Sequence, residues 1–401
     1  MTSSNSSPLA LHGGQPIRDT TLRPWPGWPI HGEEERRAML DVLESGGWWY
    51  GERVAQFERD YAAFQGAAHC VSCSSGTTAI EIVLQALGIG PGDEVIVPPY
   101  TFIATASAVV RVGATPVFVD VDDTWCMAPE GIAPAITGKT RVIMPVHFGG
   151  RIADMDRINA IAAEYGLIVV EDACHAWGAR WNERGAGVLG RCGVFSFQHS
   201  KNITAGEGGA IVTDDADLAL LCKSLTNCGR DPIQGGYRHL YIGTNARISE
   251  FAAGILLAQL GRLEEQTQTR ADNGAYLAEK LGAIPGIIPQ PGDDRITRRG
   301  YHLYCMRIDP GAFGCSREKF IEAVKAEGLE LVPGYPLPLY KQPVFAAQPR
   351  YAAMHLPMVE DLCDRSAMWF RHSTLLGSRE DMDDIAAMVH KVKANVETLG
   401  G

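Results

Sequence analysis

Apolar positions repeat along the chain with two different periods. In "TTAIEIVLQALG" they stand three and four residues apart, which predicts a helix with one apolar face. Comparable segments predict helices in "GEEERRAMLDVLESG", "VAQFERDYAAFQG", "TFIATASAVVRVG" and "MDRINAIAAEYG". Between them lie apolar runs that do not alternate, which is typical of strands buried on both faces: "DEVIVPP", "TPVFVDV", "TRVIMPVHF" and "LIVVEDA". The alternation of such helices and strands predicts an α/β fold with a mainly parallel sheet built from βαβ units.

The pattern changes near both ends of the chain. The first 30 residues are rich in Pro, Gly and Trp ("LRPWPGWPIHG"), and we expect an arm there. The segment from "RISEFAAG" to "YLAEKLG" predicts one long helix or two abutting ones, and "YHLYCMRID", "SREKFIEAVKAEG" and "DMDDIAAMVHKVKANVETLG" then predict a strand and two helices. We therefore predict an N-terminal arm over 1–30, a large domain over 31–266 and a smaller α/β domain over 267–401.

Composition excludes several classes of partner. The chain has 401 residues and a net charge of −11, with no block of Lys or Arg, so neither nucleic acid nor an anionic membrane is expected as a partner. No apolar run approaches the roughly 18 residues of a membrane span, and "MTSSNSSPLALHGG" has no signal-peptide pattern. The ten cysteines are scattered, apart from Cys70 and Cys73 in "CVSC", so we expect a cytoplasmic protein with reduced thiols. One such pair supplies only two metal ligands, and we expect neither a zinc nor a redox role for it.

In an open parallel sheet, ligands bind beyond the carboxyl ends of the strands, so the residues that follow each strand matter most. The first strand leads into "SSGTT", where the backbone N–H groups of Gly76 and Thr77 either cradle an anion or belong to an ordinary helix cap. The next leads into "PPYTF", where Tyr100 and Phe102 either offer a flat face to a ring or fill the core. "MPVHF" then brings His147 to the same edge.

Two further strands end in ionisable residues. "VVEDACHAWGA" carries Glu171, Asp172 and His175, and because buried carboxylates are costly unless paired, one acid is expected to face a cation while the other is a cap or solvated. "FSFQHSKNITAGEGGA" places Lys201 between an apolar run and a glycine cluster. Lys201 is either a solvated residue of a polar turn or an amine that reacts with a carbonyl cofactor.

Together these parts are what pyridoxal 5′-phosphate requires. Its phosphate needs N–H and hydroxyl donors, and its ring needs an aromatic neighbour. Its pyridine nitrogen needs a carboxylate to remain protonated, and its aldehyde needs a lysine amine.

With these motifs in this order, the chain resembles the DegT/DnrJ/EryC1/StrS family of pyridoxal-phosphate aminotransferases, which act on keto-sugars and cyclitols. The resemblance extends from "GGWWYGERVAQFERDYAAFQGAAHCVSCSSGTTA" to "FRHSTLLGSREDMDDI". It implies the fold-type I architecture, with a large domain around a mainly parallel sheet and a smaller C-terminal domain. It also implies a homodimer with active sites at the interface.

The resemblance assigns roles to individual residues. Lys201 is similar to the family's Schiff-base lysine, Asp172 to the partner of the pyridine nitrogen, and His175 to a residue near the phenolic oxygen of the ring. Glu171 is left as structural.

Five further residues match cofactor contacts of the family. Phe102 matches the stacking aromatic, and Asn245 in "GTNARISEF" matches an asparagine that reaches the phosphate of the neighbouring subunit. The remaining matches are to phosphate contacts: Gly76, Thr77 and Ser196.

The implied reaction moves an amino group from glutamine or glutamate to a ketone on a polyhydroxylated ring. "PGYPLP" departs from the His-Tyr-Pro stretch of many sugar aminotransferases, because Gly334 replaces the histidine. "SGGWWYG" and "VIMPVHFGG" are closer to cyclitol aminotransferases and aminohydroxybenzoate synthases than to nucleotide-sugar enzymes, and no Lys–Arg cluster is available for a diphosphate. We therefore expect an uncharged keto-cyclitol as acceptor, lined by "GGWWYG", by "HF" at 147–148 and by "YHLY" at 301–304.

Several alternatives remain open. An aminohydroxybenzoate-synthase-like enzyme would dehydrate and aromatise an amino-cyclohexene acid, whose carboxylate Arg247 or Arg230 could bind. A nucleotide-sugar aminotransferase is the other enzymatic alternative. A sugar 3-dehydratase-like relative would carry histidine in place of Lys201, and a non-catalytic regulator would not need the set of Lys201, Asp172 and Ser196.

Overall fold

The computed structural model describes residues 7–399, which pack as two compact units. The larger unit comprises Pro29–Thr267 and Asp293–His302. The smaller unit comprises the described residues of Met1–Trp28, Gln268–Gly292 and Leu303–Gly401. A short segment, residues 293–302, thus returns to the larger unit after the chain has left it. The domain boundaries expected from the sequence stay a prediction.

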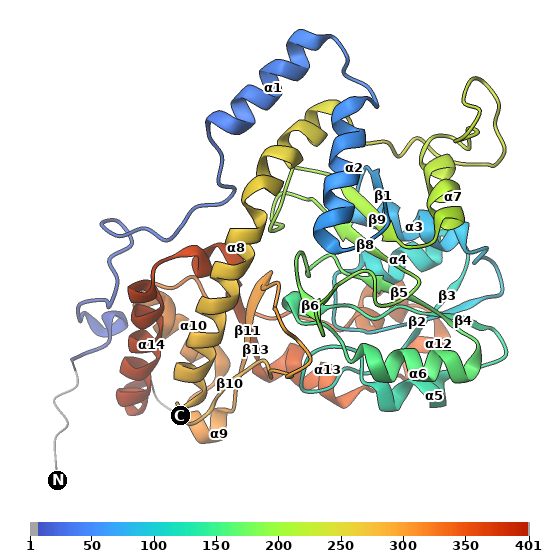
Figure 1. The fold of residues 1–401 in the computed structure, drawn as a ribbon. Helices are drawn as coiled ribbons and strands as arrows, with labels where there is room; N and C mark the ends of the chain where they lie inside the picture. The colour runs from blue at the N-terminus through green and yellow to red at the C-terminus, as the bar shows by residue number, and fades with distance from the viewer. Residues whose placement is uncertain (1–6, 400–401) are drawn as a thin grey trace. The chain divides into compact units, whose positions relative to one another are not determined.

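A seven-stranded sheet forms the centre of the larger unit (Figure 1). Its strands, in spatial order, are β1 (His69–Cys73), β9 (Gly209–Thr213), β8 (Cys192–Ser196), β5 (Ile168–Asp172), β4 (Thr140–Ile143), β2 (Glu94–Val97) and β3 (Thr115–Phe118). β9 runs antiparallel to both of its neighbours, and the other neighbouring pairs are parallel. Every residue of β2, β8 and β9 is buried, as expected of apolar runs that do not alternate.

Helices follow the strands of this sheet as their apolar periodicity predicts. α3 packs against α4 and α7, α2 packs against β1, and α6 packs against β5. The bounds of the larger helices are α1 (Glu33–Ser45), α2 (Glu52–Gln65), α3 (Gly76–Ala86), α4 (Ala104–Arg111), α6 (Met155–Tyr165) and α7 (Ala216–Thr226). α1 and α2 end at Gly46 and Gly66, whose φ angles of 69° and 75° are left-handed and therefore favour glycine. One short helix, α5 (Ile132–Ala135), and a two-stranded sheet, β6 (Arg180–Trp181) with β7 (Arg184–Gly185), complete this part.

The structure decides one alternative that the sequence left open and corrects the extent of one strand. The segment after residue 247 forms a single 33-residue helix, α8 (Glu250–Gly282), which decides between the two possibilities left open. "TRVIMPVHF" was expected to be a strand throughout, but β4 ends at Ile143. Pro145 follows closely, and a proline has no N–H to donate to a ladder.

The smaller unit is built on a four-stranded antiparallel sheet in the order β10 (Ile287–Pro289), β11 (Leu303–Ile308), β13 (Ala367–Arg371) and β12 (Val332–Pro333). Its larger helices are α10 (Arg317–Ala326) and α14 (Arg379–Ala394), which pack against each other. The unit also contains four short helices: α9 (Pro310–Phe313), which precedes α10, and α11 (Pro343–Ala346), α12 (Pro349–Ala352) and α13 (Pro357–Asp361), which lie between α10 and α14 in the chain. The strand and the two helices expected in this part of the chain are therefore present.

The described part of the expected N-terminal arm packs within the smaller unit. The fully buried carboxylate of Glu327 accepts hydrogen bonds from the backbone N–H groups of Ala10 (2.8 Å) and Ile17 (3.0 Å). Lys391 pairs with the same carboxylate at 2.8 Å and donates to the carbonyl of Gln15 at 2.6 Å. This segment is held by buried charge-assisted hydrogen bonds, so it is a packed element rather than a free arm.

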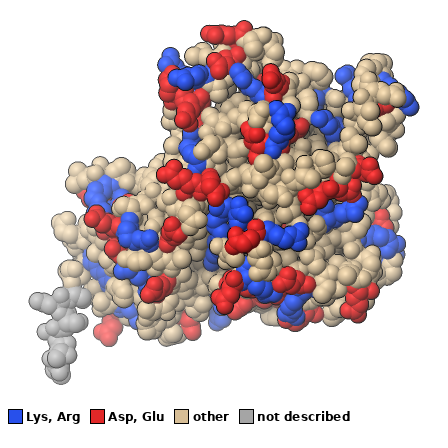
Figure 2. Space-filling view, viewed as in Figure 1, with Lys and Arg blue, Asp and Glu red and all other residues tan. Residues whose placement is uncertain are grey.

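Surface charge shows no concentration of one sign on the face seen in Figure 2, where acidic and basic side chains are interspersed. None of the helices that the structure describes combines the length and the apolar character needed to cross a bilayer. Cys70 and Cys73 are both buried, which raises the pKa of the Cys73 thiol to about 12 and that of Cys70 well above its usual range. Thiols in this state are protonated and poor nucleophiles.

Candidate active site

The carboxyl ends of β1, β8 and β5 meet at one edge of the seven-stranded sheet, since these strands run in the same direction. Asp172 is the last residue of β5 and Ser196 is the last residue of β8. β1 leads through Ser74 and Ser75 into α3. The start of β9 lies close to this turn, because a Cβ placed on Gly209 would lie 2.4 Å from the carbonyl carbon of Ser75. The polar residues singled out at these strand ends therefore lie near one another.

The N-terminus of α3 presents backbone N–H groups that have no intrahelical acceptor. Ser75 caps the helix by accepting the Thr78 N–H at 3.1 Å, while the N–H groups of Gly76 and Thr77 precede the first intrahelical hydrogen bond. A Cβ placed on Gly76 would lie only 2.9 Å from Ser196 Cβ. Ser75 is therefore a helix cap, Gly76 lets the helix end and Ser196 come together, and anion binding by Gly76 and Thr77 stays a prediction.

Asp172 is 4% exposed and is held by two hydrogen bonds. Thr105 Oγ1 donates to Oδ2 at 2.7 Å, and the N–H of Cys174 donates to Oδ1 at 3.2 Å. Thr105 lies in the first turn of α4 and was not singled out from the sequence, because a lone threonine on a helix gives no functional signal. The two donors fix the carboxylate at the edge of the sheet, where its charge is available to a cation.

Lys201 lies in the loop between β8 and β9. Burial lowers the pKa of its amine from the usual range, while electrostatic interactions with Cys174 and with the Asp172 carboxylate act in the opposite direction. Its Nζ is 5.8 Å from the centre of the Trp177 ring. A lysine of a solvated turn would show no such shift, so Lys201 is an amine in a buried setting near a carboxylate, and its reaction with a cofactor stays a prediction.

His175 is enclosed by aromatic rings. The centre of its ring is 4.4 Å from that of His302 and 5.5 Å from that of Phe148. Burial, followed by the charge of Lys201, lowers its pKa well below the usual 6.5. The N–H of Gly149 points to Nδ1 at 3.4 Å, so the neutral ring carries its proton on Nε2 and can donate it to an oxygen.

Two residues support this arrangement: Asn202, which was missed in the sequence, and His302, which was expected in the acceptor wall. Asn202 donates to the carbonyl oxygens of Gly300 (2.9 Å) and Tyr301 (3.2 Å), and its Oδ1 lies 3.1 Å from Nδ1 of His302. Asn202, the residue after Lys201, thereby contacts His302, whose ring packs against that of His175. Asn202 and His302 are 100 positions apart, and adjacency to Lys201 was the only available signal.

Glu171 is a structural acid. It is fully buried and accepts the N–H groups of Gly187 (2.7 Å), Leu189 (2.7 Å) and Gly190 (2.6 Å). It also accepts Nε2–H of His147 at 2.8 Å, so His147 is engaged in the core.

Part of the expected acceptor wall is buried within the chain. His147 and Phe148 are fully buried, and in "YHLY" Tyr301 and Tyr304 are only 4% and 1% exposed, because both segments pack into the interior. "GGWWYG" remains a candidate to line the acceptor, since Trp48 and Trp49 are 54% and 55% exposed.

The remaining residues singled out lie apart from this cluster. Tyr100 is a core residue that packs against Trp125 and Phe148, whereas Phe102 is 58% exposed and offers its ring to solvent. Asn245 is exposed on a segment whose backbone pairs with Asn227. The structure thus brings together the N-terminus of α3, Ser196, Asp172, His175 and Lys201, but it does not bring Asn245 to them within one chain.

Comparison with known proteins identifies enzymes that are similar to this chain. A protein of Amycolatopsis mediterranei (strain S699), 3-amino-5-hydroxybenzoate synthase, is 43% identical over 313 residues, which are 76% of this chain and 80% of that protein. L-glutamine:2-deoxy-scyllo-inosose aminotransferase of Streptomyces fradiae is 38% identical over 418 residues, covering 96% and 97% of the two chains.

A comparison of folds identifies the same class of enzyme. The crystal structure of a 3-amino-5-hydroxybenzoic acid synthase matches with a TM-score of 0.85 at 36% identity, covering 93% of this chain and 98% of that chain. The fold-type I aminotransferase architecture expected from the sequence is confirmed. The family model of the DegT/DnrJ/EryC1/StrS aminotransferases matches residues 29–390, and the chain belongs to this family.

Proposed function

We propose that the protein binds pyridoxal 5′-phosphate and transfers an amino group from glutamine or glutamate to a ketone on a polyhydroxylated ring, an uncharged keto-cyclitol. The observation that carries the proposal is Lys201, an amine whose pKa burial lowers, beside the fixed carboxylate of Asp172. The acceptor class rests on the inosose aminotransferase of Streptomyces fradiae, which matches 96% of this chain.

The residues at the edge of the sheet fit this cofactor. Gly76, Thr77 and Ser196 would hold the phosphate, because two N–H groups at the start of α3 lie close to the Ser196 side chain: a Cβ on Gly76 would be 2.9 Å from Ser196 Cβ. Asp172 would face the ring nitrogen, and the Nε2–H of His175 would donate to the phenolic oxygen.

Two further contacts complete the proposed site. Phe102, with its ring exposed, would stack on the cofactor. Asn245 would reach the phosphate bound by a second copy of the chain, which makes a homodimer the smallest complete enzyme. That assembly explains why Asn245 lies apart from the other site residues within one chain.

When bound, the cofactor supplies an aldehyde that exchanges with amines and a ring that withdraws electrons. Asp172 keeps the proton on the ring nitrogen through its negative charge. Lys201, with its raised neutral fraction, accepts a proton from the substrate carbon and returns it. His175 stays neutral near pH 7, so it donates a hydrogen bond without adding a positive charge.

A second function, formation of an aminohydroxybenzoate from an amino-cyclohexene acid, is favoured by one observation. The synthase of Amycolatopsis mediterranei shares 43% identity with this chain, although over only 76% of its length. The same Lys201 would serve as the base in that dehydration.

The test offers the purified protein a panel of free ring ketones, nucleotide keto-sugars and the amino-cyclohexene acid, with glutamine as donor where one is needed, and follows the products by mass. We expect that a free ring ketone is converted to the corresponding ring amine and that glutamine is consumed. A nucleotide keto-sugar with a kcat/KM at least a hundredfold higher, about 2.7 kcal/mol of transition-state preference, would contradict the acceptor class. Aromatic product without donor consumption would establish the second function instead.

A further inference from the structure

Beyond the cofactor site, Arg247 stands out as a cation with an incomplete set of partners. Its Nη1 donates to Asn227 Oδ1 at 2.8 Å and contacts Cys228 Sγ at 3.6 Å. Its Nε is buried and makes no hydrogen bond within the described residues, where Arg247 has no ion pair either. The Nε–Nη2 edge, which binds the two oxygens of a carboxylate in parallel, is therefore without a protein acceptor.

The guanidinium is held in place from both sides. Its Cζ lies 5.4 Å from the ring centre of Trp49, an indole that is 55% exposed. On the other side, the N–H of Cys228 donates to the Thr244 carbonyl at 2.9 Å, and a Cβ on Gly229 would lie 1.8 Å from the Tyr241 carbonyl oxygen. A tightly packed turn thus fixes the Asn227 that binds Arg247.

Trp49 is also fixed, although it is exposed. Glu250 accepts the N–H groups of Gly51 (2.9 Å), Arg53 (3.1 Å) and Val54 (2.9 Å), which anchors the chain directly after the tryptophan. Tyr50 OH donates to the buried Glu58 at 2.9 Å. The indole and the guanidinium therefore form a preorganised surface, which lowers the entropy cost of binding a ligand.

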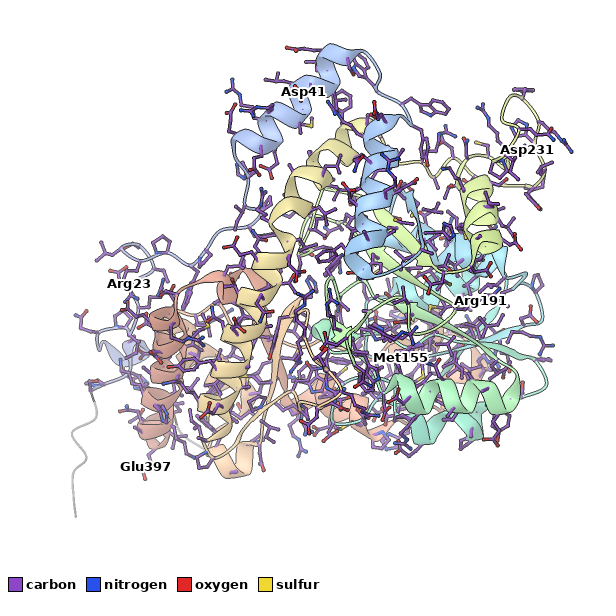
Figure 3. The ribbon with its side chains drawn as sticks, in the orientation of Figure 1. Arg23, Asp41, Met155, Arg191, Asp231 and Glu397 are labelled. Carbon is purple, nitrogen blue, oxygen red and sulfur yellow. The ribbon has the colours of Figure 1, made fainter. Side chains whose placement is uncertain are left out.

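This surface adjoins the loop that carries Lys201. Ile248, the residue after Arg247, approaches within 3.4 Å of a Cβ placed on Gly208, the end of that loop. Gln259 on α8 accepts the N–H of Thr204 in the same loop at 3.1 Å. The segments around Asn227 and Asn245 pair as a hairpin, which supports Arg247. This hairpin contains Asp231, which Figure 3 labels on the loop next to α7.

We propose that Arg247, stacked on Trp49, binds a substrate carboxylate, which for an uncharged ring acceptor is the α-carboxylate of the amino donor. This inference rests on the proposed function. A glutamine donor brings one carboxylate to the site in each turnover, and a planar guanidinium with a free bidentate edge is the donor set that such a group prefers. Arg247 is thus assigned as a specificity-determining residue of the donor half-reaction.

The experiment compares Arg247→Met, Arg247→Lys and the matched control Arg238→Met. Arg238 lies on the same hairpin, pairs with Asp231 at 3.7 Å and is 59% exposed, so its replacement removes the same charge without touching the surface. The donor half-reaction is read by the absorbance change of the holoenzyme, without acceptor, with L-glutamine and with its α-carboxamide as donors. Cofactor affinity and sedimentation are measured for each variant.

We expect Arg247→Met to raise the KM for glutamine about 10- to 100-fold, the range for losing a hydrogen-bonded charge. The wild type should prefer glutamine to the α-carboxamide by a similar factor, and Arg247→Met should show no preference. Arg247→Lys should recover part of the loss, and Arg238→Met should match the wild type.

Two results would overturn the inference: an unchanged KM for glutamine in Arg247→Met, or dissociation of the assembly with no change in donor preference. The last would assign Arg247 to an acidic group of a second copy. The donor half-reaction needs no ring ketone, so failure of the proposed acceptor class would show in the product panel and not here.

Discussion

Replacing Asp172 by Asn separates the charge of this residue from its shape. Oδ1 can keep the hydrogen bond from the N–H of Cys174, and the new amide group takes the place of Oδ2. Thr105 Oγ1 now donates to Oδ2, but its hydroxyl can turn, accept from the amide and donate to Thr101 Oγ1, 3.1 Å away. Each hydrogen bond is retained in weaker, uncharged form, so we expect a loss of stability of about 1 kcal/mol.

Activity should fall by far more. A carboxylate next to a cation raises the pKa of that cation by about 1–3 units. Without the charge of Asp172 the protonated fraction of the ring nitrogen would fall accordingly, and each unit corresponds to about 1.36 kcal/mol. The rate of the donor half-reaction should therefore fall about 10- to 1000-fold while the protein remains folded.

The assay follows the half-reaction with glutamine by stopped-flow absorbance and stability by urea denaturation. Thr105→Val is the control, because it removes one hydrogen bond to the carboxylate and leaves the charge; its rate should fall less than about tenfold. A rate for Asp172→Asn within threefold of wild type would refute the reasoning. A loss of several kcal/mol in stability would show that the residue is structural.

Three further changes test the rest of the site. Gly76→Ala places a Cβ 2.9 Å from Ser196 Cβ, and should weaken cofactor affinity at least tenfold in an absorbance titration; unchanged affinity would exclude the cradle. His175 stays neutral in the folded protein, so below pH 6.5 the unfolded state binds one more proton than the folded state. Between pH 6.5 and 5.5 the free energy of unfolding of the wild type should therefore fall by about 1 kcal/mol relative to that of His175→Gln; parallel plots of unfolding free energy against pH would contradict the lowered pKa. Glu171→Gln cannot accept all four donors and leaves at least one N–H unpaired, so urea denaturation should show a loss of about 3 kcal/mol, and a loss under 1 kcal/mol would exclude the structural role.

Local sequence patterns were sufficient for most of the fold. Apolar periodicity identified the helices and the parallel strands, because burial on one helix face or on both sheet faces leaves a direct imprint on neighbouring positions. The strand-end rule identified Asp172 and Lys201 as candidates, since the topology of a parallel sheet places strand ends at one edge.

Contacts between distant segments were not predictable in this way. The expectation that His147 faces a ligand was wrong because Glu171, 24 positions away, binds it in the core. The contact of His302 with Asn202 depends on residues 293–302 returning to the larger unit, which no local pattern encodes. The antiparallel placement of β9 likewise follows from tertiary pairing.

The central claim is that Lys201 is the amine that holds the cofactor, and reductive trapping tests it most directly. The purified holoenzyme is treated with borohydride, digested and mapped by mass, with Lys223, a half-exposed lysine of the same unit, as the internal reference. We expect the reduced cofactor on the peptide that contains Lys201, loss of the label in Lys201→Ala, and no label at Lys223. A label on another lysine, or label retained in Lys201→Ala, would contradict the account.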